Sequence, residues 1–132
     1  MDASIMWGKS LAAGAVGCIS GIRNPIRAAR VVMEKSGHLM LVGPGASRYA
    51  ASMGCETADE SYLIIPERLK RWQSLPPGSG TEMDHAAFAA ASPIDGKYGT
   101  VGAVALDSNG TTAAATSTGG MTNKLPGRVG DT

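Results

Sequence analysis

The strongest structural signal in this chain is a β-hairpin toward its C-terminal end. Residues 100–106 (TVGAVAL) resemble a strand, residues 107–110 (DSNG) form a typical turn, and residues 111–118 resemble a second strand. In such a hairpin the numbers of facing residues sum to about 218, so we expect Thr100 opposite Thr118, with Cβ atoms about 5 Å apart. Two hydroxyl groups are therefore predicted side by side at the open end of the hairpin.

The N-terminal part of the chain predicts further strands and a helix, and hence an α/β (α+β) fold. Residues 3–22 form two short strands around a turn at residues 8–10, and because both strand faces carry small apolar residues we expect a sheet covered on both sides. Asn24 is a helix cap and Pro25 suits the first helical position. The residues at helical spacing that we expect to be buried are Ile26, Ala29 and Met33.

A composition change divides the chain. Before it, residues 38–42 predict a short buried strand, residues 43–45 a tight turn, and residues 46–53 a helix. Residues 56–99 contain four of the prolines and the run Gly78-Ser79-Gly80, which predicts a flexible linker. Within it we expect one helix over about 66–73 and an alanine-rich turn at 85–91.

Composition excludes several classes of protein. The formal net charge is only +1, so no basic surface for nucleic acid is expected, and no apolar run reaches the ~18–20 residues of a membrane span. The chain has 43% hydrophobic residues but only 5% aromatic ones, so its core must be built from small side chains. Cys18 and Cys55 are expected to be free thiols of a cytoplasmic protein, with a disulfide as the alternative.

The predicted threonine pair has two interpretations. Facing threonines are common in ordinary sheets, so the pair could be structural only. However, Gly99 and Thr100 lie where the linker meets the strand, and cleavage between them would make Thr100 an N-terminal residue. Its α-amine, with a pKa of about 7.7–8.0, could then act as the base that activates its own hydroxyl.

At this junction the sequence closely resembles a known family. Residues 99–131 (GTVGAVALDSNGTTAAATSTGGMTNKLPGRVGD) are similar to the plant-type L-asparaginase/isoaspartyl peptidase family of N-terminal-nucleophile hydrolases. The resemblance extends upstream to segments 1–6, 12–17, 23–46 and 49–54. It therefore covers most of the chain outside the linker.

The resemblance implies a role for each candidate site residue. Thr100 would be the nucleophile, released by self-cleavage after Gly99, and Thr118 would support its hydroxyl. Arg128 would bind the α-carboxylate of the substrate through its guanidinium, and Asp131 would bind the α-ammonium group. The reaction implied is hydrolysis of L-asparagine, of β-aspartyl (isoaspartyl) dipeptides, or of both.

The resemblance also implies a fold, a four-layer αββα sandwich, which we expect to be incomplete in this chain. Residues 1–99 correspond to the C-terminal part of the family's α-subunit region and residues 100–132 to the N-terminal part of its β-subunit region. The family's Asn-Ala-Gly and Thr-Gly segments, which supply the oxyanion hole, are expected to lie outside the chain. The alternative function is therefore an inactive, uncleaved fragment of such an enzyme.

Cofactors and partners are expected to be few. The family's sodium-binding loop is also expected to lie outside this chain, so neither a cofactor nor a metal is predicted. The expected partner is a small amino-acid or dipeptide substrate, without nucleic acid or membrane. In the full-length family the resemblance implies a homo-oligomer of cleaved α/β pairs.

Overall fold

The computed structural model describes residues 1–81 and 100–130, so the predicted turn at 85–91 lies outside the described residues. The structure is mixed α/β, as predicted. Its elements in chain order are β1 (Asp2–Trp7), β2 (Ala12–Gly17), α1 (Pro25–Lys35), β3 (Met40–Val42), α2 (Gly43–Ser52), α3 (Glu60–Leu63), α4 (Pro66–Gln73), β4 (Thr100–Leu106) and β5 (Thr112–Thr118).

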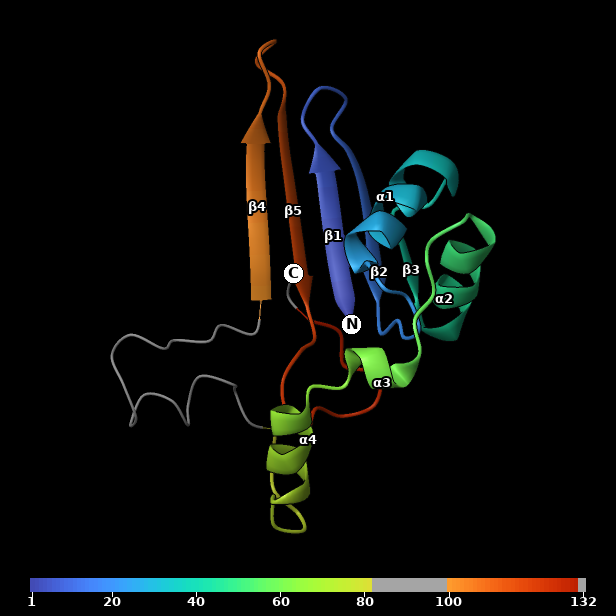
Figure 1. Cartoon of the computed structure of the whole chain (residues 1–132). Coiled ribbons are helices and arrows are strands. Elements are labelled where there is room, and N and C mark those ends of the chain that lie inside the picture. Colours follow the sequence, from blue (N-terminus) through green and yellow to red (C-terminus); the bar gives the residue numbers. More distant parts are fainter. Residues whose placement is uncertain (82–99, 131–132) are drawn as a thin grey trace, which may run out of the picture.

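The five strands form one sheet in the order β3-β2-β1-β5-β4. β2 and β3 are parallel neighbours connected through α1, and the other neighbouring pairs are antiparallel. The C-terminal hairpin joins the sheet through β5, which pairs with β1 from Asp2↔Thr118 to Trp7↔Ala113. Two segments far apart in the sequence therefore lie side by side (Figure 1).

Helix α1 packs on one face of the sheet, where glycine allows a close approach. Asn24 caps the helix by accepting a hydrogen bond from the amide of Arg27 at 3.3 Å, and Pro25 begins it, as predicted. A Cβ atom on Gly14 of β2 would collide with the backbone carbonyl of Ala29. The helix and β2 are therefore in backbone contact.

This contact changes which helix residues are buried. Of the expected set only Ala29 is buried, whereas Ile26 and Met33 are half-buried. Ala28 and Val32 occupy the remaining core positions. Small side chains face the sheet because the short distance between helix and strand leaves no room for larger ones.

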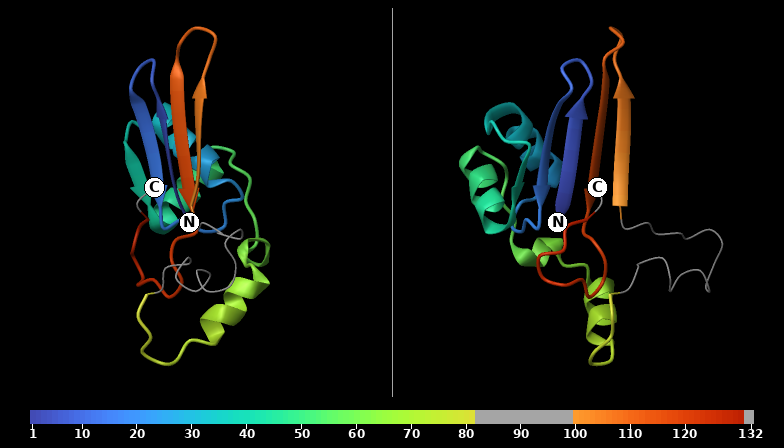
Figure 2. Two further views of the ribbon diagram at one scale, coloured as in Figure 1. Left: turned by 90° about the vertical axis from the view of Figure 1, so that its left-hand side faces the viewer. Right: turned by 180° about the vertical axis from the view of Figure 1, so that it is seen from behind.

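Among the described residues helices pack on one face of the sheet, so the expectation of cover on both sides stays a prediction. Helices α1 and α2 gather on the side of β2 and β3 (Figures 1 and 2). Helix α1 also reaches β1 and β5, whereas neither α1 nor α2 packs on β4. On the face opposite α1, the register aligns Met6 with Ala114 and Val104, and the Val104 side chain is 87% exposed. We call this surface the open face. Small apolar residues on both faces of a strand allow other segments to pack on both faces. They do not identify which segment packs there.

Two predictions around β3 are also wrong. The strand is an exposed edge rather than buried, since among the described strands it pairs only with β2, and Met40 and Val42 are 43% and 55% exposed. Residues 43–45 are not a separate turn but the first turn of α2. Pro44 is tolerated there because the first helical turn requires no amide donor from it.

The described part of the linker contains the predicted helix and one that was not predicted. α4 has the expected bounds, and the single-turn α3 precedes it. Before α3, Arg23 donates its amide to the carbonyl of Glu56 at 2.9 Å, and Ile22 forms a bridge with Thr57. The chain then carries α4 beyond the end of the sheet where Thr100 and Thr118 lie (Figures 1 and 2).

Candidate active site

The structure confirms the predicted threonine pair. Thr100, the first residue of β4, is the register partner of Thr118, the last residue of β5. The turn sets this register: the Asp107 carboxylate accepts hydrogen bonds from the amides of Asn109 and Thr111, both at 2.8 Å. A turn of this kind predicts which strand residues face each other, because its hydrogen bonds join residues that are close in the sequence.

The two threonines occupy different environments. Thr118 is only 7% exposed, and its hydroxyl accepts a hydrogen bond from the amide of Gly120 at 3.0 Å. Thr100 is exposed on the edge strand. The pair therefore combines an accessible hydroxyl with a fixed one. Gly99 lies outside the described residues.

A buried carboxylate, Asp2, lies beside Thr118 and was missed by the sequence analysis. The side chain is fully buried and is the register partner of Thr118 on the other side of β5. Its two oxygens accept hydrogen bonds from the amides of Cys18 at 2.7 Å and Gly130 at 2.9 Å. The sequence signal for this buried carboxylate was an acidic residue at the start of a largely apolar strand.

The charge of Asp2 is stabilised where it lies. Burial alone raises the pKa of its carboxyl, but the two amide hydrogen bonds oppose this effect, as does Lys124, whose ammonium lies 3.9 Å from a carboxylate oxygen. The net result is a pKa below the ordinary aspartate value. Asp2 is therefore a permanent negative charge at neutral pH.

Residues 119–130 return to the same end of the sheet and bring Arg128 to it. A Cβ atom on Gly130 would lie 2.8 Å from the methyl group of Thr118, so the backbone of Gly130 packs against the Thr118 side chain. The Cys18 thiol donates to the carbonyl of Arg128 at 3.3 Å. The structure thus places Arg128 two residues from the contact with Thr118, whereas Asp131 lies outside the described residues. Cys18 and Cys55 are both free, as predicted.

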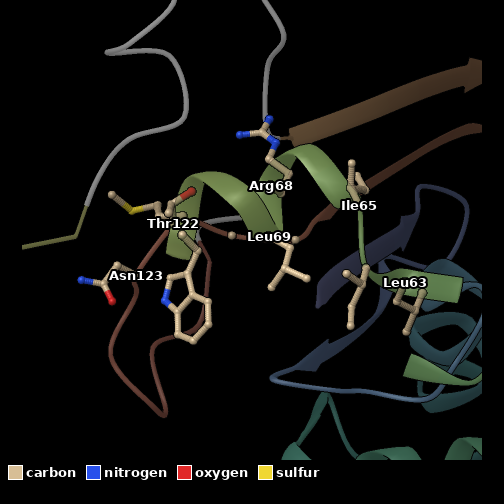
Figure 3. A pocket seen from close by; sticks show the side chains of 11 residues that line it. Leu63, Ile65, Arg68, Leu69, Thr122 and Asn123 are labelled. Carbon is tan, nitrogen blue, oxygen red and sulfur yellow. The ribbon is translucent and has the colours of Figure 1, made fainter. Parts of the chain in front are cut away.

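A cavity of about 490 Å³ lies between α4 and the first residues after β5. Figure 3 shows that Leu63 and Leu69 point to the same side, while Arg68 leaves α4 on the opposite side. The lining residues are Leu63, Ile64, Ile65, Arg68, Leu69, Trp72, Gly119, Gly120, Met121, Thr122 and Asn123. Most of this lining is apolar, and its Gly119 directly follows Thr118.

Comparison with known proteins decides the family. A family model described as Asparaginase matches residues 1–132. The chain belongs to the asparaginase family. The resemblance of residues 99–131 is therefore confirmed at the family level.

Curated members of the asparaginase family match nearly the whole chain. An isoaspartyl peptidase of Escherichia coli is 48% identical over 133 residues, covering 99% of this chain and 40% of that protein. An isoaspartyl peptidase/L-asparaginase of Danio rerio is 47% identical, and one of Homo sapiens is 46% identical, again with 40% of each relative covered. The chain spans about two fifths of the length of these relatives.

Two kinds of feature are absent from residues 1–81 and 100–130. No helix there combines the length and apolarity needed to cross a bilayer. Nor do three or more His, Cys, Asp or Glu side chains meet there in a way that could hold a metal ion.

Proposed function

We propose that this chain is part of a threonine-nucleophile amidohydrolase that acts on L-asparagine, on β-aspartyl dipeptides, or on both. The observation that carries the proposal is the pairing of Thr100 with Thr118 in a member of the asparaginase family, at the end of the sheet to which the backbone of Arg128 returns. The names of the relatives, isoaspartyl peptidase and L-asparaginase, support this choice of substrates.

The proposed first step is self-cleavage between Gly99 and Thr100. The Thr100 hydroxyl attacks the Gly99 carbonyl, the C–N bond breaks and an ester forms in its place. Water then hydrolyses the ester, leaving a carboxylate on Gly99 and a free α-amine on Thr100. Gly99 favours the attack because it has no side chain beside the carbonyl.

In the proposed hydrolysis, the free amine of Thr100 takes the proton from its hydroxyl, which attacks the substrate's side-chain amide. An acyl-enzyme forms, ammonia or an amine departs, and water releases aspartate. Thr118 supports the nucleophile, Arg128 pairs with the α-carboxylate and Asp131 with the α-ammonium group. No cofactor takes part in this scheme.

The same proposal includes a four-layer αββα sandwich and assembly of cleaved α/β pairs. The open face supports it, because large apolar side chains such as Val104 and Leu106 are 87% and 70% exposed there. Covering such a face with a second sheet would bury them. The substrate site would then lie at one end of the two packed sheets.

A second candidate is an uncleaved fragment without activity of its own. It is favoured by the exposure of every residue of β4, including Thr100. Stabilisation of an oxyanion requires fixed donors in a site that excludes water. An edge strand open to solvent does not provide that environment.

Intact-mass measurement during incubation at neutral pH tests the proposal. Self-cleavage predicts two fragments that meet between Gly99 and Thr100, together with release of ammonia from L-asparagine. Thr100→Ala should abolish both, whereas Thr112→Ala, at the other end of the same hairpin, should preserve both. An intact wild-type chain that releases no ammonia would favour the second candidate.

A further inference from the structure

The hairpin turn at residues 107–110 contains an asparagine followed by a glycine, and this pair takes no part in the chemistry proposed above. The backbone nitrogen that follows an asparagine can attack its side chain and close a succinimide ring. A glycine in the next position favours this attack, because no side chain obstructs the nitrogen. Asn109 and Gly110 are both exposed, and a Cβ atom on Gly110 would meet nothing within 4 Å. The turn therefore meets the steric conditions for ring closure.

The chain has two other asparagines, and both are protected from this reaction. Asn24 precedes Pro25, whose ring nitrogen has no proton to lose and cannot attack. Asn123 donates hydrogen bonds from its side-chain amide to the carbonyls of Ser79 at 2.7 Å and Gly80 at 3.3 Å, which hold the side chain in place. The asparagine of the turn, in contrast, is exposed and precedes glycine.

Water has access to this turn, which lies at the end of the sheet opposite the threonine pair (Figure 1). The turn between β1 and β2 lies beside it, where the amide of Gly8 donates to the carbonyl of Thr112 at 2.7 Å. A cavity of about 480 Å³ is lined by residues of both turns, including Lys9 and Asn109. Water can therefore reach a succinimide formed at this position and hydrolyse it.

Asp107 controls how freely the attacking nitrogen can react. Its backbone carbonyl accepts a hydrogen bond at 3.1 Å from the amide of Gly110, which must lose this proton in the reaction. Its carboxylate accepts hydrogen bonds from the amides of Asn109 and Thr111, both at 2.8 Å, and so holds the turn closed. The turn must open before Asn109 reacts, and the bonds to Asp107 determine how often it opens.

We propose that Asn109 is a site of spontaneous deamidation, at a rate that Asp107 limits. The Gly110 nitrogen forms a bond to the side-chain carbonyl carbon of Asn109. The bond from that carbon to the amide nitrogen breaks, and ammonia leaves with the proton from Gly110. Water then opens the succinimide: attack at the backbone carbonyl yields isoaspartate, and attack at the side-chain carbonyl yields aspartate. This inference does not depend on the proposed function.

Both products change the turn that sets the register of Thr100 with Thr118. Each adds a negative charge beside the Asp107 carboxylate, and like charges at this distance repel. Isoaspartate also lengthens the backbone of the turn by one methylene group. Deamidation therefore weakens the hairpin that carries the candidate nucleophile.

Peptide mass spectrometry of the chain during prolonged incubation at mildly alkaline pH tests the proposal. We expect Asn109 to gain the mass of a deamidation, and electron-transfer fragmentation to identify part of the product as isoaspartate. Asn109→Ser should remove this gain, and the other two asparagines serve as internal controls. Reaction at Asn24 or Asn123 before Asn109 would overturn the proposal.

Asp107→Ala tests whether the closed turn limits the rate. Loss of two hydrogen bonds should make deamidation of Asn109 about tenfold faster. Asp59→Ala, at an exposed acidic residue outside the hairpin, should leave the rate unchanged. An equal rate in wild type and Asp107→Ala would overturn the role given to Asp107.

The wild-type chain in urea provides a comparison that does not require a folded variant. The turn is open there, so Asn109 should react at least about tenfold faster than in the native chain. Equal rates in urea and in buffer would show that Asp107 does not limit the reaction. A native chain that stays unmodified while the chain in urea reacts completely would overturn deamidation of the folded protein.

Discussion

The Asp2 carboxylate holds together three segments that meet beside the threonine pair. It begins β1, its oxygens bind amides from the end of β2 and from the C-terminal segment, and it pairs in register with Thr118 on β5. A buried charge is costly unless its hydrogen bonds are satisfied, and here they are. One residue thus orders the end of the sheet at which chemistry is proposed.

We expect Asp2→Asn to lower the free energy of unfolding by about 2–3 kcal/mol. The amide has one acceptor oxygen, so that one backbone N–H would lose its partner and face an NH2 group instead. Urea denaturation at pH 7 would measure the change. Glu67→Gln on the surface of α4 is the control and should change stability by less than about 0.5 kcal/mol.

The lowered pKa of Asp2 makes this contribution dependent on pH. The folded state holds the carboxylate more strongly than the unfolded chain, in which its pKa is about 3.9. The stabilisation is therefore complete above that value and is lost as the pH falls through the folded pKa. Denaturation curves should show that the difference in free energy of unfolding between wild type and Asp2→Asn is constant from pH 7 to about pH 5. Below about pH 4 this difference should become smaller. If the difference in free energy of unfolding stayed the same below pH 4, the lowered pKa of Asp2 would be contradicted.

At the scale of elements, the contact of α1 with β2 depends on a glycine in β2, which has no side chain to hold the helix away. Gly14 lies against the backbone of Ala29 and Met33, and neither backbone can move without shifting the helix. We expect Gly14→Ala to destabilise the fold by about 1–3 kcal/mol, because overpacking displaces the helix. Thermal unfolding monitored by circular dichroism would measure it.

Gly45 of α2 offers a matched comparison. Its added Cβ would meet nothing within 4 Å, and the position is helical. Alanine favours the helix there, so Gly45→Ala should be neutral or stabilise by up to about 1 kcal/mol. Equal destabilisation by the two substitutions would contradict the role given to the helix–sheet contact.

At the scale of the whole molecule, the sheet combines an open face with an edge strand, β4, which pairs on one side only within residues 1–81 and 100–130. Val104 lies on both, since it belongs to the edge strand β4 and is 87% exposed. Exposed edges and apolar surfaces favour association between chains. We expect the wild-type chain to self-associate, and Val104→Asp to shift it toward the monomer in sedimentation velocity.

Leu11→Asp is the control for this experiment. Leu11 is 70% exposed but lies in the turn between β1 and β2, outside the strands. The substitution Leu11→Asp should therefore leave the sedimentation profile of the wild-type chain unchanged. A wild-type chain that remains monomeric at high concentration would show that the open face does not drive association.

The sequence by itself determined the features that depend on local interactions. The register of Thr100 with Thr118 follows from a turn whose hydrogen bonds span four residues, and the bounds of α4 and the start of α1 follow from proline and capping residues. The family follows from a long run of matching residues around that hairpin. These features need no knowledge of distant contacts.

Only the tertiary structure decided the burial of Asp2, the exposure of β3 and the cavity beside α4. Each depends on segments distant in sequence that meet in space: Asp2 is bound by Gly130, β3 lies at the edge because β1 takes the other side of β2, and α4 faces Met121. Periodicity reports which residues can be buried, but not which partner buries them. The threonine pair was therefore predictable, whereas the buried Asp2 carboxylate and the cavity beside α4 were not.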